Sequence, residues 1–481
     1  MLPLRHSFYF VIAAALSVAA CSDDNDDGGN NPPPAPGEAL INADITQSRT
    51  LFADTTYTLV GYVKVTSGAV LTIQPGTRIV GDADTPGSSL WILRGARIEA
   101  SGTATEPIVF TSERAAGSRA PGDWGGIIII GNGIINRNSG GAPILTEGGA
   151  AGEAENYAGG TDNADNSGTL RYVRIEFAGY DISTAGGQEL NGLSMYAVGS
   201  GTRLEYVQVM SGLDDSFEWW GGAVDGRYLV SYEAGDDHFD WTEGYRGRNQ
   251  FLVAFQSQRL TPATGTGQPS ADPRGIEADG CDPVAGSFCT LTETGASEPF
   301  SGPVFANFAI IGPGTTVAGF PTDGNGVVLR RGTGGTLDRG IVARWPGIGL
   351  QGRDAWTDSL RLRDSLSITN MVLAENAAGN YDIDPTRFFQ EAKFITSNHR
   401  TATTAAELFV SLSPGTGGQG FDWRPATGAA NASIGSEVVP PRLGTRVAGY
   451  PYGAWEVTTY VGPAAPGGTA WWQGWTNYAI N

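Results

Sequence analysis

The chain has 481 residues, among them 70 glycines and 27 prolines, and its 50 acidic against 30 basic residues give a formal net charge of −20. With 40% hydrophobic residues it is too apolar to be disordered. So much glycine without a triplet period excludes collagen and disfavours helical bundles, where each glycine costs about 1 kcal/mol. The acidic balance disfavours a nucleic-acid partner, because phosphate binding needs a basic face. Many short strands with tight turns are therefore expected, with cations, neutral ligands or cationic ligands as partners.

The first 21 residues have the pattern of an export signal. Arg5 precedes an apolar run over residues 8–20, which is too short to span a bilayer. The run leads into the sequence VAAC, which resembles a bacterial lipobox and ends at Cys21. We therefore expect Cys21 to be lipidated and to become the first residue of the mature protein. The alternative is an ordinary signal peptide followed by a chance cysteine.

Residues 22–45 are predicted to form a solvated tether. They begin with the acidic sequence SDDNDD and continue with a stretch rich in glycine and proline. Such a composition cannot bury a core. Acidic residues directly after a lipid-bearing cysteine resemble the export signals of lipoproteins that reach the cell's outer face. The sequence thus predicts a bacterial outer-membrane protein that faces the exterior and contacts the membrane only through its lipid.

The remaining cysteines are Cys281 and Cys289, which would close a short loop. An even number of cysteines in an oxidising compartment favours a disulfide between them. A metal site or a thiol nucleophile is the alternative.

A repeat of about 22 to 24 residues organises the middle of the chain. Its members are NGLSM at 191–195, DSFEW at 215–219, DHFDW at 237–241, RGIEA at 274–278 and NGVVL at 325–329. Short strands at this spacing, separated by Gly, Asn and Asp, are typical of a parallel β-helix, whose coils stack about 4.8 Å apart. A sandwich or a propeller also uses short strands, but a propeller blade needs about 40 residues and no such period is present.

Three motifs in this region are also found together in a known family. They are PGT at residues 75–77, DWGG at 123–126 and the repeated element Asp-Asp-x-Phe-acid-Trp. With them, the region from Thr46 to Asn370 resembles a family of bacterial secreted or surface lipoproteins with pectate-lyase-like β-helices. The resemblance implies an all-β, right-handed parallel β-helix with loop insertions, which we expect over residues 46–400. No catalytic residue is carried over from it.

Residues 401–481 are predicted to form a C-terminal cap. The repeat fades there, while Pro, Gly and Trp concentrate, as in the sequence AWWQGW at 470–475. An uncovered last coil would expose strand edges, so these tryptophans are expected to cover the open end of the solenoid. Their alternative role is stacking on sugar rings.

Stacking the repeats places carboxylates in columns. One outward-facing column reads Ser194, Glu218, Asp240, Glu277 and Val328, and a second reads Asn191, Asp215, Asp237, Arg274 and Asn325. Asp214 and Asp236 precede two members of the second column. Two charges about 5 Å apart repel by about 3.5 kcal/mol at an effective dielectric near 20, and by about 0.9 kcal/mol in water.

Four interpretations of this acidic column remain open. Stacked carboxylates supply several of the six to eight oxygens that Ca²⁺ takes. A shared proton would raise one pKa in each close pair and create a general acid beside a general base. The acids could instead pair with Arg246, Arg248 or Arg274. Asp215 and Asp237 could also cap turns through backbone N–H groups, or the column could be a solvated face.

The candidate residues follow from these interpretations. Glu218, Asp240 and Glu277 are the predicted metal ligands, with Ca²⁺ as the ion. Trp220, His238 and Arg274 are the predicted contacts to a ligand, although His238 could equally be a satisfied surface side chain. Asp214, Asp236, Asp237 and Arg246 are the predicted catalytic residues if the protein is an enzyme.

Three functions are compatible with this pattern. The first is a non-catalytic surface lipoprotein whose β-helix binds a glycan or an envelope protein with the help of Ca²⁺. The second is a polysaccharide lyase or glycoside hydrolase; lysine is nearly absent, so a lyase would need Arg246 or Arg274 as its base. The third is a structural envelope component or adhesin. The chain lacks the further motifs of polygalacturonase-like hydrolases, which disfavours hydrolysis.

Overall fold

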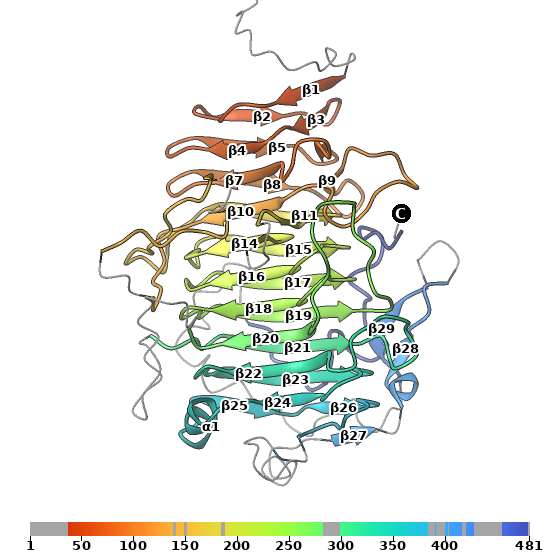
Figure 1. Cartoon of the computed structure of the whole chain (residues 1–481). Helices are drawn as coiled ribbons and strands as arrows, with labels where there is room; N and C mark the ends of the chain where they lie inside the picture. The colour runs from red at the N-terminus through yellow and green to blue at the C-terminus, as the bar shows by residue number, and fades with distance from the viewer. Residues whose placement is uncertain are drawn as a thin grey trace, which may run out of the picture.

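The computed structural model describes residues 37–137, 141–148, 152–183, 188–281, 299–382, 390, 400–402, 404–415, 420–427 and 455–479. Nearly all of its strands belong to two long parallel sheets that run side by side along one axis (Figure 1). The parallel β-helix predicted from the repeat is confirmed. In the described parts of the chain, no helix is long and apolar enough to cross a membrane.

The larger sheet has 16 strands and the smaller has nine. The path of the larger sheet is β1 (Glu38–Ile41), β3 (Thr56–Leu59), β6 (Arg78–Gly81), β9 (Ile108–Ser112), β11 (Gly168–Glu176), β15 (Arg203–Met210), β17 (Asp225–Tyr232), β19 (Arg248–Phe255), β21 (Val304–Ile311), β23 (Gly335–Ala343), β26 (Val372–Ala374) and β27 (Arg400–Ala402). Beside this path lie β2 (Arg49–Leu51), β5 (Val70–Ile73), β8 (Arg97–Ser101) and β25 (Leu366–Thr369). The smaller sheet contains β4 (Tyr62–Val65), β7 (Ser89–Ile92), β10 (Gly126–Ile130), β14 (Leu193–Tyr196), β16 (Phe217–Trp220), β18 (Phe239–Thr242), β20 (Arg274–Asp279), β22 (Asn325–Arg330) and β24 (Leu350–Gly352).

A few elements lie outside the two sheets. They are the antiparallel pairs β12 (Tyr180–Asp181) with β13 (Glu189–Leu190) and β28 (Phe409–Ser411) with β29 (Asp422–Pro425), the helix α1 (Ala355–Leu362) and the short 3₁₀ helix η3 (Ala405–Glu407). Asp354 caps α1 by accepting a hydrogen bond from the backbone N–H of Thr357 at 2.9 Å.

The strand register agrees with the columns read from the sequence. Phe217 of β16 pairs with Leu193 of β14 on one side and with Phe239 of β18 on the other. The series continues through Ile276 of β20 to Val327 of β22. Apolar side chains at these positions and two residues further on fill the interior of the coils, because successive side chains of a strand point to opposite faces.

Bulky residues occupy a left-handed corner in four consecutive coils. Tyr172, Tyr206, Tyr228 and Phe251 have φ values of 48°, 54°, 59° and 64°, and each interrupts the pairing of its strand. Their rings stack outside the coils, with centroid separations of 4.4, 4.4 and 5.1 Å. We call these four residues the aromatic ladder. A left-handed backbone costs such residues about 1–2 kcal/mol each, and ring stacking offsets some of that cost.

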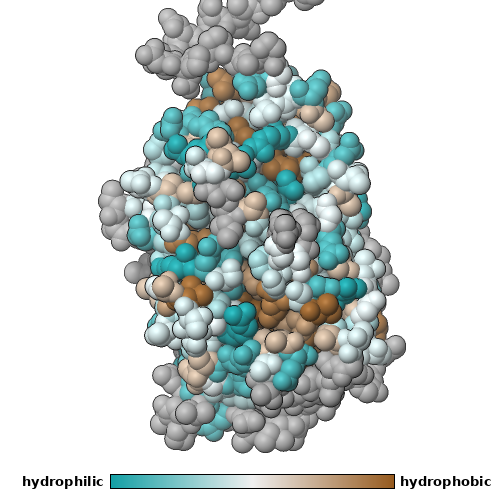
Figure 2. All heavy atoms as spheres, turned by 90° about the vertical axis from the view of Figure 1, so that its right-hand side faces the viewer, coloured by the Kyte–Doolittle hydropathy of each residue, from teal (hydrophilic) through white to brown (hydrophobic). Residues whose placement is uncertain are grey.

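The C-terminal segment lies along the flank of the β-helix rather than over an open end. Arg339 of β23 donates to the carbonyl of Thr458, and Gln208 of β15 donates to the carbonyl of Asn477. The segment therefore spans the coils from β23 back to β15. Trp423, Trp472 and Trp475 are buried there against outward-facing residues of the larger sheet, such as Tyr232, Phe255 and Ile311. Seen from the side on which β28 and β29 lie, the surface mixes hydrophilic and apolar areas (Figure 2).

The predicted end-covering role of these tryptophans therefore has to be corrected. The outer face of the larger sheet carries apolar side chains that need a cover, and the C-terminal segment supplies it. The first coil also begins earlier than residue 46, because β1 pairs with β3 from Glu38 onwards. The lipidation site Cys21 and the disulfide partner Cys289 lie outside the described residues, so both assignments stay predictions. Cys281 itself is buried.

Candidate cation site

A cavity of about 220 Å³ lies where the acidic columns cross the smaller sheet. Its lining combines Gln268 and Ser270 with the carboxyl groups of Glu147, Glu189, Asp214, Asp215, Glu218, Asp236, Asp237, Asp240 and Glu277. We call it the acidic pocket. Glu218, Asp240 and Glu277 come from adjacent positions of β16, β18 and β20 and form one column across the strands.

The carboxylates of the pocket approach one another closely. Oxygens of Asp215, Glu218 and Asp240 lie within 4.8 Å of one another, and so do those of Asp237, Asp240 and Glu277. Asp214, Asp215 and Asp236 form a third such group. The first group shares Asp240 with the second and Asp215 with the third. The three groups therefore form one continuous acidic surface. The sequence predicted this column correctly.

Asp215 and Asp237 also hold the coils together. Asp215 Oδ1 accepts a hydrogen bond from the backbone N–H of Asp237 at 2.8 Å, and Asp237 Oδ1 accepts one from the N–H of Arg274 at 2.5 Å. Asn191 has the same role in the preceding coil, where it accepts from the N–H of Asp215 at 3.0 Å. Asp215 and Asp237 thus cap backbone N–H groups, as one interpretation expected, but these belong to the next coil rather than to their own turns. This role accounts for one oxygen of each carboxylate.

This role gives a prediction for stability. Asp215→Ala is expected to destabilise the metal-free protein by about 1–3 kcal/mol, because the buried N–H of Asp237 loses its acceptor. Asp215→Asn keeps an acceptor oxygen and removes a charge from the pocket, so it is expected to be neutral or stabilising. Urea unfolding of both variants in chelator checks this. Equal stability of the two would contradict the capping role.

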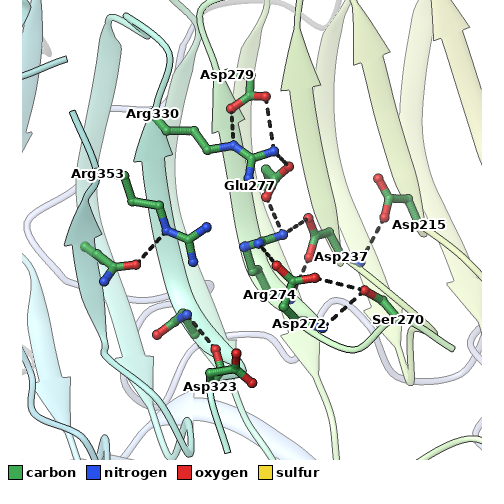
Figure 3. Close-up of polar contacts among 12 residues, drawn as sticks. Asp215, Asp237, Ser270, Asp272, Arg274, Glu277, Asp279, Asp323, Arg330 and Arg353 are labelled. Carbon is green, nitrogen blue, oxygen red and sulfur yellow. Dashed lines mark hydrogen bonds and ion pairs between the residues drawn. The ribbon is translucent and has the colours of Figure 1, made fainter. Parts of the chain in front are cut away.

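Two arginines neutralise one end of the pocket. Arg274 forms ion pairs with Glu277, Asp272 and, at 3.6 Å, with Asp237 (Figure 3). Arg330 contacts Glu277 and forms a 2.7 Å ion pair with Asp279. Pairing with Arg274 was predicted. Arg330 was missed, although the register that places it beside Asp279 follows from the same repeat.

The other end of the pocket lies beyond direct contact with these arginines, which act on Asp236 and Asp240 only at longer range. Within the described part of the chain, no lysine or arginine forms an ion pair with Asp214, Asp215, Glu218, Asp236 or Asp240. Two buried carboxylate oxygens, Asp236 Oδ1 and Asp240 Oδ1, have no hydrogen-bond partner there. An unpartnered buried oxygen costs free energy, so these two atoms are the ones that could coordinate a cation or accept a hydrogen bond.

The electrostatics of the carboxylates agree with this interpretation. Burial, followed by repulsion from Asp236, raises the pKa of Asp214 well above its usual value. Burial and the neighbouring acids also raise the pKa of Asp215, Glu218 and Asp240. For Glu277, burial and Asp279 raise the pKa to about 7 despite the opposing arginines. These carboxyl groups therefore keep their protons to a higher pH than ordinary carboxyl groups do.

Three of the predicted site residues do not line the pocket. Two of them, Trp220 and Arg246, instead make packing contacts and hydrogen bonds elsewhere. Trp220 is only 5% exposed and stacks on Tyr196 at 4.0 Å, so it offers no free face to a ligand. Arg246 lies over the ring of Phe300 and donates to its carbonyl at 3.1 Å. The structure therefore gives no support for Arg246 as a base at this pocket or for Trp220 as a ligand platform.

His238, the third of these residues, needs a similar correction. Both a ligand-binding role and an exposed position were considered, but the side chain is 1% exposed. Its Nδ1 lies 2.5 Å from Ser231 Oγ, and burial lowers the pKa of His238 to about 3. It is a neutral side chain of the interior.

Two pocket residues come from outside the repeat. Glu147 belongs to the insertion after β10, and Glu189 lies on β13, within the insertion between β11 and β14. The first insertion also covers the outer face of the smaller sheet, where Ile144 and Tyr157 pack against Ile128 and Tyr196. Such cover explains why outward-facing Glu218 is only 8% exposed. Neither insertion has a repeat in its sequence, so the sequence could not have placed Glu147 and Glu189 at the pocket.

The comparison with known proteins concerns the fold that carries this pocket. A family model described as a pectate-lyase-like β-helix domain matches residues 43–424. The chain belongs to the pectate-lyase-like β-helix domain family. The match contains the whole predicted region of resemblance, Thr46 to Asn370. No curated protein and no solved structure matches the chain significantly. The acidic pocket of this family member is therefore described from its own residues.

Proposed function

We propose that the protein is a non-catalytic surface β-helix that binds Ca²⁺ in the acidic pocket and, through the bound ion, a glycan. The observation that carries the proposal is the end of the pocket beyond direct contact with the arginines. There, among the described residues, five carboxylates lack an ion pair with a cationic side chain and two of their buried oxygens lack any partner. A bound cation would satisfy both deficits at once.

The donor set favours Ca²⁺ over other ions. All candidate ligands are carboxylate or amide oxygens, which suit hard cations, whereas zinc and copper sites use imidazole or thiolate. Ca²⁺ accepts six to eight oxygens in an irregular arrangement, while Mg²⁺ demands octahedral geometry and keeps most of its waters. A pocket crowded with carboxylates at mixed heights on three strands fits the more tolerant ion.

A glycan is the ligand that the fold and the chemistry support. The pectate-lyase-like β-helix suggests a carbohydrate-related or surface function. Sugar hydroxyls are oxygen donors that can complete the coordination of a bound Ca²⁺. Without the ion, the dense negative charge of the pocket would repel an acidic glycan. A neutral glycan would cover the pocket and leave its carboxylates buried and unpaired. Glycan binding at the acidic pocket should therefore require Ca²⁺.

The cellular setting follows from the N-terminal pattern. Lipidation at Cys21 would anchor the protein to the bacterial outer membrane, and the acidic tether would hold the β-helix away from it. A protein of the envelope is the alternative partner. A structural or adhesin role without a ligand would need the same scaffold but no occupied pocket.

Calorimetric titration of the full mature chain against a panel of polysaccharides tests this function. Wild type is expected to bind at least one glycan in Ca²⁺ and to lose at least about tenfold in affinity in chelator, since tenfold corresponds to about 1.4 kcal/mol. The double variant Glu218→Gln, Asp240→Asn should behave in Ca²⁺ as wild type does in chelator. Asp54→Asn, an exposed carboxylate outside the pocket, is the matched control. If no glycan of the panel bound more tightly in Ca²⁺ than in chelator, the proposal would be contradicted.

A second candidate, a glycoside hydrolase or polysaccharide lyase, is favoured by one observation. Glu277, with its pKa near 7, could hold a proton at neutral pH beside ionised neighbours, as a general acid does. Oxygens of Asp237, Asp240 and Glu277 lie within 4.8 Å, closer than the separation of about 6.5–9.5 Å in inverting hydrolases. Release of reducing ends or unsaturated products that disappears in Asp236→Ala, Asp237→Ala would establish this alternative.

A further inference from the structure

The tryptophans near the C-terminus have two different environments. Trp472 and Trp475 are 0% and 1% exposed and belong to the packing of the C-terminal segment on the larger sheet. Trp471 is partly exposed and lines a separate cavity of about 360 Å³. This cavity, which we call the aromatic groove, lies between the aromatic ladder and the C-terminal segment. Its volume falls in the range of about 300–1,000 Å³ that is usual for small-molecule sites.

The walls of the groove are aromatic rings in fixed positions. The lining includes the rings of Tyr206, Tyr228, Phe251, Tyr460 and Trp471. The ring of Trp471 lies 5.1 Å from that of Tyr228 at an angle of 58°, and its indole N–H donates to the carbonyl of Pro463 at 2.8 Å. The groove is therefore formed before any ligand arrives, which lowers the entropic cost of binding.

The polar groups of the groove are few and are also held in place. The carboxylate of Glu456 is 48% exposed and forms a 2.6 Å ion pair with Arg227. Gln250 donates to the carbonyl of Glu456 at 2.6 Å and fixes the backbone there. Burial raises the pKa of both Tyr206 and Tyr228, so their hydroxyl groups stay neutral hydrogen-bonding groups. The charges of Glu456 and Arg227 balance, unlike those of the acidic pocket.

We propose that the aromatic groove is a second saccharide site, which takes a neutral sugar ring without any metal ion. The C–H face of the sugar packs on the ring of Trp471, because aromatic faces suit such apolar surfaces. The carboxylate of Glu456 accepts hydrogen bonds from sugar hydroxyls. This site is independent of the proposed Ca²⁺ pocket, which lies on the smaller sheet while the groove lies over corners of the larger one.

Titration of neutral gluco-, manno- and xylo-oligosaccharides into the full mature chain in excess chelator tests this site alone. Wild type is expected to bind at least one of them. Trp471→Ala should weaken that binding by at least about tenfold, as truncation of a central aromatic contact does. Glu456→Gln should weaken it by a few-fold, and circular dichroism should show that the fold survives the loss of the ion pair with Arg227. Asp54→Asn, an exposed carboxylate outside both sites, should change nothing.

Two results would overturn the proposal. One is the absence of binding of every neutral oligosaccharide to wild type in chelator. The other is unchanged affinity in both Trp471→Ala and Glu456→Gln. If Trp471→Ala proves unfolded by circular dichroism, Glu456→Gln alone decides. Chelator is present throughout this experiment, so a negative result does not bear on Ca²⁺-dependent binding at the acidic pocket. A negative result for Ca²⁺-dependent binding likewise does not bear on the aromatic groove.

Discussion

Deprotonation of the acidic pocket is expected to cost the metal-free protein at least roughly 3 kcal/mol of stability as the pH rises from about 5 to about 8, and Ca²⁺ is expected to remove most of that cost. The cause is the acidic pocket. Its carboxyl groups have pKa values raised by burial and by one another in the folded state, and ordinary values once the chain unfolds. For Glu277 alone, the change from 4.5 to about 7 corresponds to roughly 3 kcal/mol.

The sign follows from proton binding. Between about pH 4.5 and 7 the folded protein holds more protons in the pocket than the unfolded chain, so the stability is greatest below that range. Raising the pH through the folded pKa removes the protons and leaves repelling buried charges. Ca²⁺ binds the ionised form and stabilises it by mass action, by about 2.7 kcal/mol at a concentration 100 times its Kd.

Urea unfolding at a series of pH values, in chelator and in excess Ca²⁺, checks this expectation. Glu218→Gln, Asp240→Asn should flatten the pH profile in chelator and remove the response to Ca²⁺. Asp54→Asn should leave both unchanged, because this exposed carboxylate lies outside the pocket. His238 lies outside the pocket and titrates alike in wild type and variant, so the comparison isolates the pocket. Identical pH profiles of wild type and Glu218→Gln, Asp240→Asn in chelator would show that the pocket is not electrostatically strained.

The second large effect is expected from the interior of the coils. Trp219→Ala should cost about 3–5 kcal/mol, the usual cost of truncating a large buried aromatic residue. Trp219 is fully buried, stacks on Tyr245 at 5.2 Å and meets Phe305 edge-on at 5.9 Å. Neighbouring coils contact each other only locally, so a cavity in one coil weakens its two neighbours as well.

Urea midpoints with their slopes measure this loss. Phe52→Ala is the matched control, because Phe52 is 49% exposed and removal of its ring should change stability by less than about 0.5 kcal/mol. A loss below about 1 kcal/mol for Trp219→Ala would mean that the ring does not fill the solenoid core.

The fold and the acidic column could be predicted because a parallel β-helix repeats its chemistry in sequence order. Adjacent coils pair in parallel and in register, so alignment of Glu218, Asp240 and Glu277 in the repeat was enough to place them side by side. A capping role of Asp215 was one of the open interpretations, based on the turn chemistry of aspartate, and the structure shows that it caps the next coil. The contact of Arg330 with Asp279 could have been predicted from the same alignment. It was missed because a long insertion separates the repeat of Arg330 from the previous one.

The rest of the site depends on segments that have no period. Glu147 reaches the pocket from an insertion whose path the repeat does not determine. The same insertion buries side chains that face outward from the strands, so exposure could not be inferred from strand alternation. The C-terminal segment was placed at the wrong surface, because composition shows that tryptophans need cover but not which face they cover. His238 was misjudged since its position in a turn does not reveal that the ring turns inward.

Calorimetric titration of Ca²⁺ into the chelator-stripped mature protein near neutral pH tests the central claim most directly. Wild type is predicted to show saturable binding that is lost in Glu218→Gln, Asp240→Asn. It should be retained in Asp84→Asn, Glu113→Gln. This control changes the two exposed members of another carboxylate group, whose third member, Asp82, is buried. Absence of Ca²⁺ binding by wild type, or full binding by the pocket variant, would contradict the assignment of the acidic pocket as a cation site.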